Sequence, residues 1–214
     1  MVFAPHPDDE TLGCGGTIAK KTNEGYDVHI VYMTNGENSH QEILGIVLNP
    51  SPQEVSRIRQ AEAERAAKLL GVNHGNLIFL NFEDGTLEKA TEPARERVLN
   101  ILEKLQPIEI YYPGETELHG DHRFTSIIVK DSINMLRIKP KLYKYIIWPS
   151  KGQNKKELKN EVVSDISKFA HTKQLAIQEY KSQTTMFSKT QRRPILSNRF
   201  LKKFQRNSEK FIVE

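Results

Sequence analysis

Two short polar segments of this chain carry residue types that bind metal ions and move protons. The first, HPDDE at residues 6–10, places an imidazole and a carboxylate three positions apart, His6 and Asp9. Pro7 stiffens the turn between them, so both side chains can point the same way. The second segment, HGDH at residues 119–122, offers a third ligand through either of its histidines. Two histidines and one carboxylate leave a coordination position open for water, as in catalytic zinc sites.

The first segment also has a simpler interpretation. Asp8, Asp9 and Glu10 could form a charged turn at the start of a helix, where acidic side chains favour the positive end of the helix dipole. Two His/Asp clusters, each following an apolar strand-like run, favour the metal site over this alternative.

The elements that must position these residues alternate along the chain between β-rich apolar runs and segments of helical periodicity. This alternation predicts an α/β fold, a Rossmann-like three-layer sandwich with a mainly parallel sheet and helices on both faces. With 214 residues, we expect a single domain over 1–214. The predicted strands are VFA (2–4), DVHIVYMT (27–34), NLIFLN (76–81), IEIYYP (108–113) and KLYKYIIW (141–148).

The clearest predicted helix begins at SPQE and ends at Gly71. Ser51 can cap it, Pro52 suits its first turn, and Glu54 completes a capping box. Further helices are predicted over 11–25, 92–105, 121–136 and 164–183, and the last is followed by a basic segment. Residues 151–161 are predicted to form a solvated loop, and 38–50 either part of a substrate wall or a small packed subdomain.

Ligands of open parallel sheets bind beyond the carboxyl ends of the strands. Four polar clusters follow four successive predicted strands. They are HPDDE (6–10), NGEN (35–38), FEDG (82–85) and GETELHGDH (114–122). We therefore expect all of them at one edge of the sheet.

These motifs resemble those of the LmbE-like, or PIG-L, family of deacetylases, which remove the acetyl group from N-acetylglucosamine units. PHPDDE (5–10) and HGDH (119–122) carry most of the resemblance. Weaker similarities follow in the family's order at TNGE (34–37), IRQAEAERAAKLLG (58–71), DG (84–85) and KQLAIQEYKSQ (173–183), so the resemblance covers nearly the whole chain.

The resemblance implies a role for each candidate residue. His6, Asp9 and His122 would be the ligands of a Zn²⁺ ion, although Fe²⁺ suits the same ligands. Asp8 would be the general base. His119 would lie beside the metal without binding it, and would stabilise the developing oxyanion or return a proton.

Three other residues are candidates for the site. Two of them have both a functional and a structural interpretation, and the third has a role by the resemblance alone. Asp121 either orients an imidazole from behind the metal ligands or caps the helix that begins there. Arg59 either contacts the sugar or is solvated on its charged helix. Asp84 is predicted to contact substrate by the resemblance alone.

The predicted function is metal-dependent hydrolysis of an acetyl group from an N-acetylglucosamine-containing small molecule. A phosphoester hydrolase would usually need more ligands to hold two metals. A non-catalytic carbohydrate- or nucleotide-binding module on the same fold is the remaining alternative. Asp8 argues against it, because a binding module needs no base beside the metal.

Composition narrows the partners and the location. The net charge of +4 is spread among acidic residues, so no nucleic-acid partner is expected. The single cysteine, Cys14, favours a reducing compartment, and we expect a cytoplasmic protein. No apolar run approaches the ~20 residues that span a bilayer, so no membrane partner is expected. The sequence leaves open a homo-oligomer and an extension before Met1.

The remaining histidines and glycines have structural interpretations. GCGG (13–16) lets the first helix approach the sheet closely and lacks the third glycine of a dinucleotide fingerprint. Trp148 is expected to pack, and the histidines without a partner of matching spacing are expected to be structural or solvated. These are His29, His40, His74 and His171.

Overall fold

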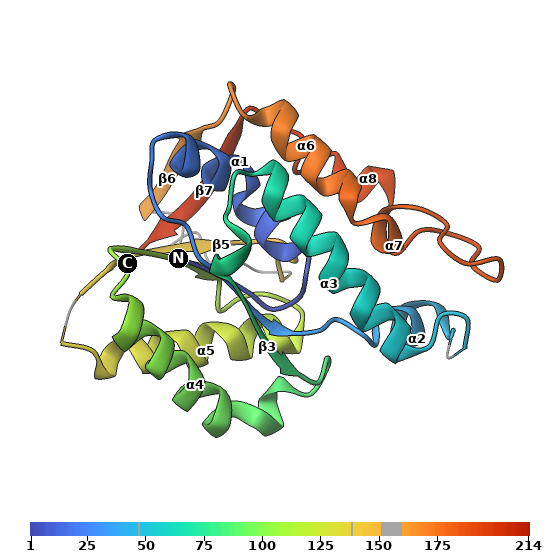
Figure 1. Ribbon diagram of the computed structural model, residues 1–214, viewed down its shortest axis with the longest axis horizontal. Coiled ribbons are helices and arrows are strands. Elements are labelled where there is room, and N and C mark those ends of the chain that lie inside the picture. Colours follow the sequence, from blue (N-terminus) through green and yellow to red (C-terminus); the bar gives the residue numbers. More distant parts are fainter. Residues whose placement is uncertain (47, 138, 151–159) are drawn as a thin grey trace.

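The computed structural model describes residues 1–46, 48–137, 139–150 and 160–214. Its strands form one seven-stranded sheet in the order β3-β2-β1-β4-β5-β7-β6 (Figure 1). The strands are β1 (Val2–Ala4), β2 (Ile30–Thr34), β3 (Leu77–Phe82), β4 (Glu109–Pro113), β5 (Lys141–Tyr145), β6 (Glu161–Asp165) and β7 (Ser208–Val213). The first five run parallel, and β7 pairs antiparallel with both β5 and β6. The predicted mainly parallel sheet is confirmed.

Helices cover both faces of this sheet, which confirms the predicted sandwich. Figure 1 shows α4 and α5 below the sheet and α1, α3 and α6 above it. The longer helices are α1 (Asp9–Asn23), α3 (Pro52–Leu69), α4 (Thr91–Leu105), α5 (Gly120–Met135) and α6 (Ala170–Glu179). Short helices are α2 (Ser39–Leu44), α7 (Lys181–Thr184), α8 (Asn198–Leu201), η1 (His74–Asn76) and η2 (Leu87–Ala90).

Two hydrophobic cores follow from this layering, one on each face. Both faces of the central strands are covered, so β1 and β2 are buried along their whole length and read as continuous apolar runs. Phe3 packs in the core between the sheet and helices α4 and α5, whereas its neighbours Val2 and Ala4 pack in the core between the sheet and helices α1, α3 and α6. Alternate side chains of one strand thereby join the two cores.

Local signals place helices α1 and α3 close to where the sequence predicts them. The capping box of α3 is present: Ser51 Oγ accepts from the Glu54 N–H, and the Glu54 carboxylate accepts from the Ser51 N–H at 2.8 Å. The glycines at the start of α1 allow close packing, because a Cβ on Gly13 would lie 2.6 Å from the Tyr145 ring and one on Gly16 would lie 2.3 Å from Ile166.

The order of the strands fixes where a site can form. β1 lies between β2 and β4, so the chain leaves β1 toward one neighbour and later returns to its other side. At such a switch point the loops after adjacent strands diverge and leave a crevice at the carboxyl edge. The HPDDE loop follows β1 and the HGDH segment follows β4, so both reach this crevice.

The predicted helix over 164–183 is wrong at its beginning and too long. Ser164 and Asp165 end β6, the helix begins at Ala170, and it breaks at Tyr180 before α7. The Asp165 carboxylate accepts the Ser167 N–H at 2.9 Å and so forms a turn instead of a helical start. β6 pairs with β7 from the basic C-terminal segment, where no strand was predicted.

Two other sequence predictions concern the chain outside this sheet. The predicted solvated loop over 151–161 falls mostly on residues 151–159, which lie outside the described residues. Within the described ranges, no helix is both long and apolar enough to cross a bilayer.

Candidate metal centre and active site

The side chain of His6 lies where β1 ends and is held from both sides by carboxylates. Its backbone N–H donates to Asp9 Oδ2 at 3.0 Å, and its Nδ1 lies 3.0 Å from the same oxygen. Its Nε2 lies 3.0 Å from Asp84 Oδ1 and 3.2 Å from Asp121 Oδ2. Three of the four polar clusters predicted at one sheet edge therefore meet at this imidazole.

Asp84 and Asp121 are themselves fixed by backbone donors. The Asn38 N–H donates to Asp84 Oδ2 at 3.0 Å. The N–H groups of Gly85 and Leu87 donate to the two oxygens of Asp121 at 2.8 and 3.1 Å. These backbone bonds hold both carboxylates in place, which suits residues that orient the His6 ring.

His122 completes the group from the first turn of α5. Its Nε2 lies 3.1 Å from Asp9 Oδ2, so one carboxylate oxygen faces both His122 and His6. The ring is 1% exposed, and neither of its nitrogens makes a hydrogen bond to any described residue. Buried imidazole nitrogens normally have a partner.

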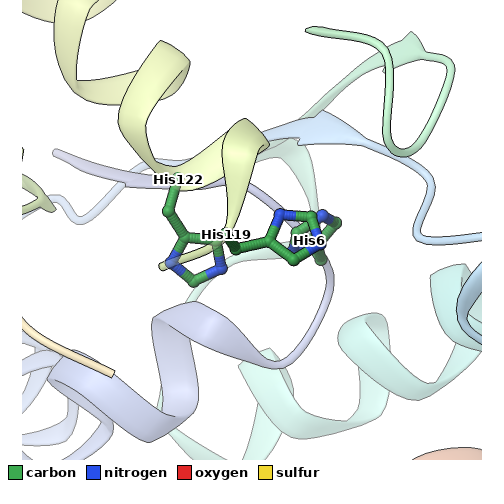
Figure 2. Close-up of side chains that lie close together, drawn as sticks. All are labelled: His6, His119 and His122. Atoms are coloured by element: carbon green, nitrogen blue, oxygen red, sulfur yellow. The ribbon is translucent and has the colours of Figure 1, made fainter. Parts of the chain in front are cut away.

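His119 lies in the same cluster with a different local role. Its Nδ1 accepts the Asp121 N–H at 3.2 Å and caps α5, so the side chain of Asp121 does not provide the cap. Figure 2 shows the three imidazoles gathered at the start of this helix. The His119 ring lies 4.7 Å from that of His6 and 5.4 Å from that of His122.

Two groups among the described residues could hold a metal ion, since their ligand atoms lie within 4.8 Å of one another: His6 with His119 and His122, and His6 with Asp84 and Asp121. Donor chemistry separates them. The carboxylates of the second group are already bonded to backbone N–H groups, whereas His122 has two buried nitrogens without a hydrogen bond. The group that contains His122 therefore fits a metal ion better, and Asp9 Oδ2 lies between two of its histidines, 3.0 Å from His6 Nδ1 and 3.1 Å from His122 Nε2.

Asp8 and Arg59 form a buried pair on the wall of this cluster. Arg59 Nη2 lies 3.1 Å from Asp8 Oδ2, and its guanidinium also donates to the carbonyl oxygens of Pro7 and Gly36. The solvated alternative for Arg59 is wrong, since the residue is 3% exposed. Asp8 adopts a φ of 131°, an unfavourable conformation for an aspartate of the kind that clusters at functional sites.

The surroundings of the cluster shift the pKa values of Asp8 and Asp9 in opposite directions. Burial alone would raise the pKa of Asp9, but the neighbouring His122 and His6 hold it well below its usual range. Burial raises the pKa of Asp8 well above its usual range, although Arg59 opposes the shift. Adjacent carboxylates are thereby pushed in opposite directions, a common feature of acid–base sites.

The pKa values of His6 and His119 are also shifted in opposite directions. Burial alone would lower the pKa of His6, but Asp84, Asp121 and Asp9 raise it well above its usual range. For His119, burial together with the charges of His6 and His122 lowers the pKa to about 4. His119 is therefore neutral near pH 7.

The cluster opens into a small pocket of about 90 Å³. Its polar wall includes Asp8, Asp84, Arg59 and His119, and its apolar wall includes Trp148, which also stacks on Phe200 at 4.0 Å as the packing prediction required. This volume is well below the roughly 300–1,000 Å³ of typical ligand pockets. A pocket of this size encloses only a small chemical group.

Helix α2 forms part of the same pocket. Ser39, Glu42 and Ile43 line it, which places part of residues 38–50 in the wall, as one of the two sequence interpretations expected. A larger cavity of about 250 Å³ lies around Cys14 and Ile18 at the amino end of β1, and none of the predicted site residues lines it. Size alone therefore does not locate the site.

Sequence reasoning missed residues that support the cluster from behind. Glu10 is fully buried; its Oε2 accepts the Asp8 N–H at 3.1 Å, and its Oε1 accepts from the hydroxyls of Thr11 and Tyr180. Glu117 is also buried, beside His122. Both lie inside the polar clusters, and their position there was the available signal.

The glycine of the NGEN cluster is required by this arrangement. Gly36 has a φ of 62°, and a Cβ there would lie 2.3 Å from Arg59 Nη1. We predict that Gly36→Ala displaces Arg59, loosens Asp8 and lowers turnover about 10- to 100-fold.

The matched control is Gly25→Ala, which has a φ of 84° and nothing within 4 Å of the added Cβ. It should share the backbone strain of Gly36→Ala, about 1–3 kcal/mol, without the loss of turnover. Equal turnover in the two variants would contradict the role given to Gly36.

Fold and site together define an α/β sandwich with a His/Asp cluster at the switch point of its sheet. The family model for PIG-L, the GlcNAc-PI de-N-acetylases, matches residues 1–133. This match spans more than half of the chain, and the protein belongs to that family.

One named relative agrees with this membership. The chain is 26% identical over 187 residues to a probable N-acetyl-alpha-D-glucosaminyl L-malate deacetylase 2 of Bacillus cereus, covering 86% of this chain and 83% of the relative.

Solved structures share the fold. N,N'-diacetylchitobiose deacetylase of Pyrococcus horikoshii has a TM-score of 0.76 at 24% identity, covering 100% of this chain and 82% of that one. GalB of Pseudomonas putida, a 4-carboxy-2-hydroxymuconate hydratase, has a TM-score of 0.70 at 21% identity, covering 85% and 78%. The fold thus also occurs in a protein named for a different reaction.

Proposed function

We propose that this protein is a metal-dependent N-deacetylase that hydrolyses the acetamide of an N-acetylglucosamine-containing small molecule. The observation that carries the proposal is the convergence of His6 and His122 on one oxygen of Asp9, beside the buried Asp8. Family membership and a relative named a deacetylase support the reaction type.

His6, Asp9 and His122 are the proposed ligands of a Zn²⁺ or Fe²⁺ ion. When bound, such an ion lowers the pKa of a bound water to about 7 and polarises the acyl oxygen. Asp84 and Asp121 hold the His6 ring in place through its Nε2. Asp84 and Arg59 also line the pocket and are proposed to contact the substrate.

Asp8 is proposed to act as the general base. Its carboxylate lines the pocket beside Asp9 and is kept from turning away by Arg59. It takes a proton from the attacking water and passes it to the leaving amine, because the same carboxyl group is protonated once the first transfer is complete. Glu10, through the Asp8 N–H, fixes the backbone from which it projects.

His119 is proposed to stabilise the oxyanion. Because its Nδ1 accepts the Asp121 N–H, a neutral ring carries its proton on Nε2 and can donate it as a hydrogen bond. Removing one oxyanion donor typically costs about 100- to 1,000-fold in turnover.

We predict that His119→Ala lowers turnover by roughly that factor and leaves the metal content unchanged. Zinc analysis of the purified variant beside its steady-state kinetics checks both parts. Loss of the metal would instead show that His119 is a ligand and that the two histidines of HGDH have been exchanged.

The proposed function is tested by amine release. Metal-free protein would be assayed with and without Zn²⁺ on N-acetylglucosamine, diacetylchitobiose and N-acetylglucosaminyl malate. Zinc-dependent release of one amine per acetate supports the proposal. Tight binding of one metal ion without release from any of the three would favour the alternative of a carbohydrate- or nucleotide-binding module.

A further inference from the structure

Glu117 is a buried carboxylate to which the proposed mechanism gives no role. It lies between β4 and α5 with a side chain of 0% exposure. Its Oε1 accepts the Ile147 N–H at 2.5 Å, and its Oε2 accepts the Trp148 N–H at 2.6 Å. The side chain thus joins the loop after β4 to the chain that leaves β5.

The same carboxylate faces His122. Glu117 Oε2 lies 3.7 Å from His122 Nδ1, which is just beyond hydrogen-bond distance. His122 Nδ1 makes no hydrogen bond within the described part of the chain. Oε2 accepts one backbone donor and retains a second lone pair for the imidazole.

The chemistry of a ligating imidazole makes this contact informative. His122 directs Nε2 toward Asp9, so a ring that binds metal through Nε2 carries its proton on Nδ1. A buried N–H without an acceptor would cost about 1–3 kcal/mol. A closure of under ~1 Å between ring and carboxylate brings the pair to hydrogen-bond distance.

We propose that Glu117 is a positioning residue of the metal centre: its Oε2 accepts the Nδ1–H of His122 and thereby fixes the tautomer and direction of that ligand. The inference rests on the metal site proposed above. Carboxylate partners of this kind raise the basicity of a histidine ligand and hold its ring orientation.

The test is the zinc affinity of Glu117→Gln, measured by competition with a chromophoric chelator. An amide keeps the size of the side chain but accepts more weakly than a carboxylate and offers one oxygen to three N–H donors. We expect zinc to bind about 10- to 100-fold more weakly than to the wild type.

The matched control is Glu62→Gln. Glu62 is 1% exposed and accepts from the backbone N–H and hydroxyl of Ser182, as Glu117 accepts from backbone donors, but it contacts no histidine of the cluster. Both variants should unfold at lower temperature than the wild type, and Glu117→Gln alone should lose zinc affinity. Equal zinc affinity in the wild type and both variants would overturn the inference.

A second measurement needs no variant. In ¹⁵N-histidine-labelled, zinc-loaded wild type, the His122 Nδ1–H should give a slowly exchanging, downfield proton resonance. A ring that is protonated on Nε2, or an Nδ1 proton that exchanges at the rate of a solvent-exposed one, would overturn the inference even if Glu117→Gln does not fold.

The outcomes also separate this inference from the proposed function. Wild-type protein that binds zinc through a Glu117-dependent site but releases no amine would refute the deacetylase and support Glu117. Amine release by the wild type with unchanged zinc affinity in Glu117→Gln would support the deacetylase and refute the role of Glu117. Absence of zinc binding by the wild type would refute both.

Discussion

Replacement of Asp8 by asparagine is expected to lower turnover at least about a hundredfold while the protein retains its metal, because general-base catalysis typically contributes about 10²- to 10⁴-fold. Asp8 is not among the proposed ligands, and its Oδ2 faces Arg59. An asparagine oxygen can keep that contact, but the amide cannot accept the proton of water. The variant therefore separates proton transfer from metal binding.

The pH profile sharpens this expectation. Only the deprotonated carboxylate accepts a proton, so wild-type activity should fall as pH drops through the pKa of Asp8. Burial raises that pKa, so the acidic limb of the pH profile, where activity falls, lies at higher pH than for an ordinary carboxyl group. In Asp8→Asn the residual activity should lack the limb.

A loss of activity through unfolding must be distinguished from loss of the base. Arg59 is buried, and removing the charge of its partner costs stability because a buried guanidinium is left less compensated. The thermal midpoint and zinc content of Asp8→Asn therefore accompany the kinetics. A folded, zinc-loaded variant with near-normal turnover would refute the proposed mechanism.

The convergence of the polar loops could be predicted because it follows from a rule about parallel sheets. HPDDE, NGEN, FEDG and HGDH each follow a strand, and the carboxyl ends of parallel strands share one edge. The contacts of His6 with Asp84 and Asp121 show that three of these loops meet. Strand order was not needed for that conclusion, although it determines that β1 and β4 are neighbours.

The partners within the site could not be predicted in the same way. Glu10 was interpreted as a charge at a helix start, yet its carboxylate accepts from Tyr180, 170 positions away in the sequence. Arg59 was compatible with a solvated helix face, because charge alone does not show that Pro7 and Gly36 present carbonyl oxygens to it. Such contacts depend on how distant elements pack.

The C-terminal region shows where local patterns fail. The helical periodicity over 164–183 predicts a helix that begins too early, because residues 164 and 165 belong to β6. That strand is specified by its pairing with β7, more than forty residues later in the chain. Lys173 of α6 and Glu209 of β7 form a buried ion pair at 2.6 Å, and Glu209 also accepts the Gly16 N–H of α1 at 2.8 Å. These charged residues look solvated in the sequence and become interior only through tertiary packing.

His6→Ala is the second variant with a large expected effect, the loss of metal and activity together. The change removes a proposed ligand and also leaves Asp84 and Asp121 without the imidazole that separates them. The affinity for zinc should fall by more than the roughly 10- to 100-fold expected for an outer partner. Elemental analysis after dialysis measures the metal, and amine release measures the activity.

His40→Ala provides the matched control, because His40 is also buried but packs against Phe187 outside the cluster. It should keep its zinc. Added Zn²⁺ should restore chelator-treated wild type and His40→Ala but not His6→Ala. The control shows how much activity is lost through reduced stability alone. Loss of zinc from His6→Ala but not from His40→Ala ties the ion to the His6 imidazole. Stoichiometric zinc in His6→Ala would instead place the metal elsewhere among the carboxylates.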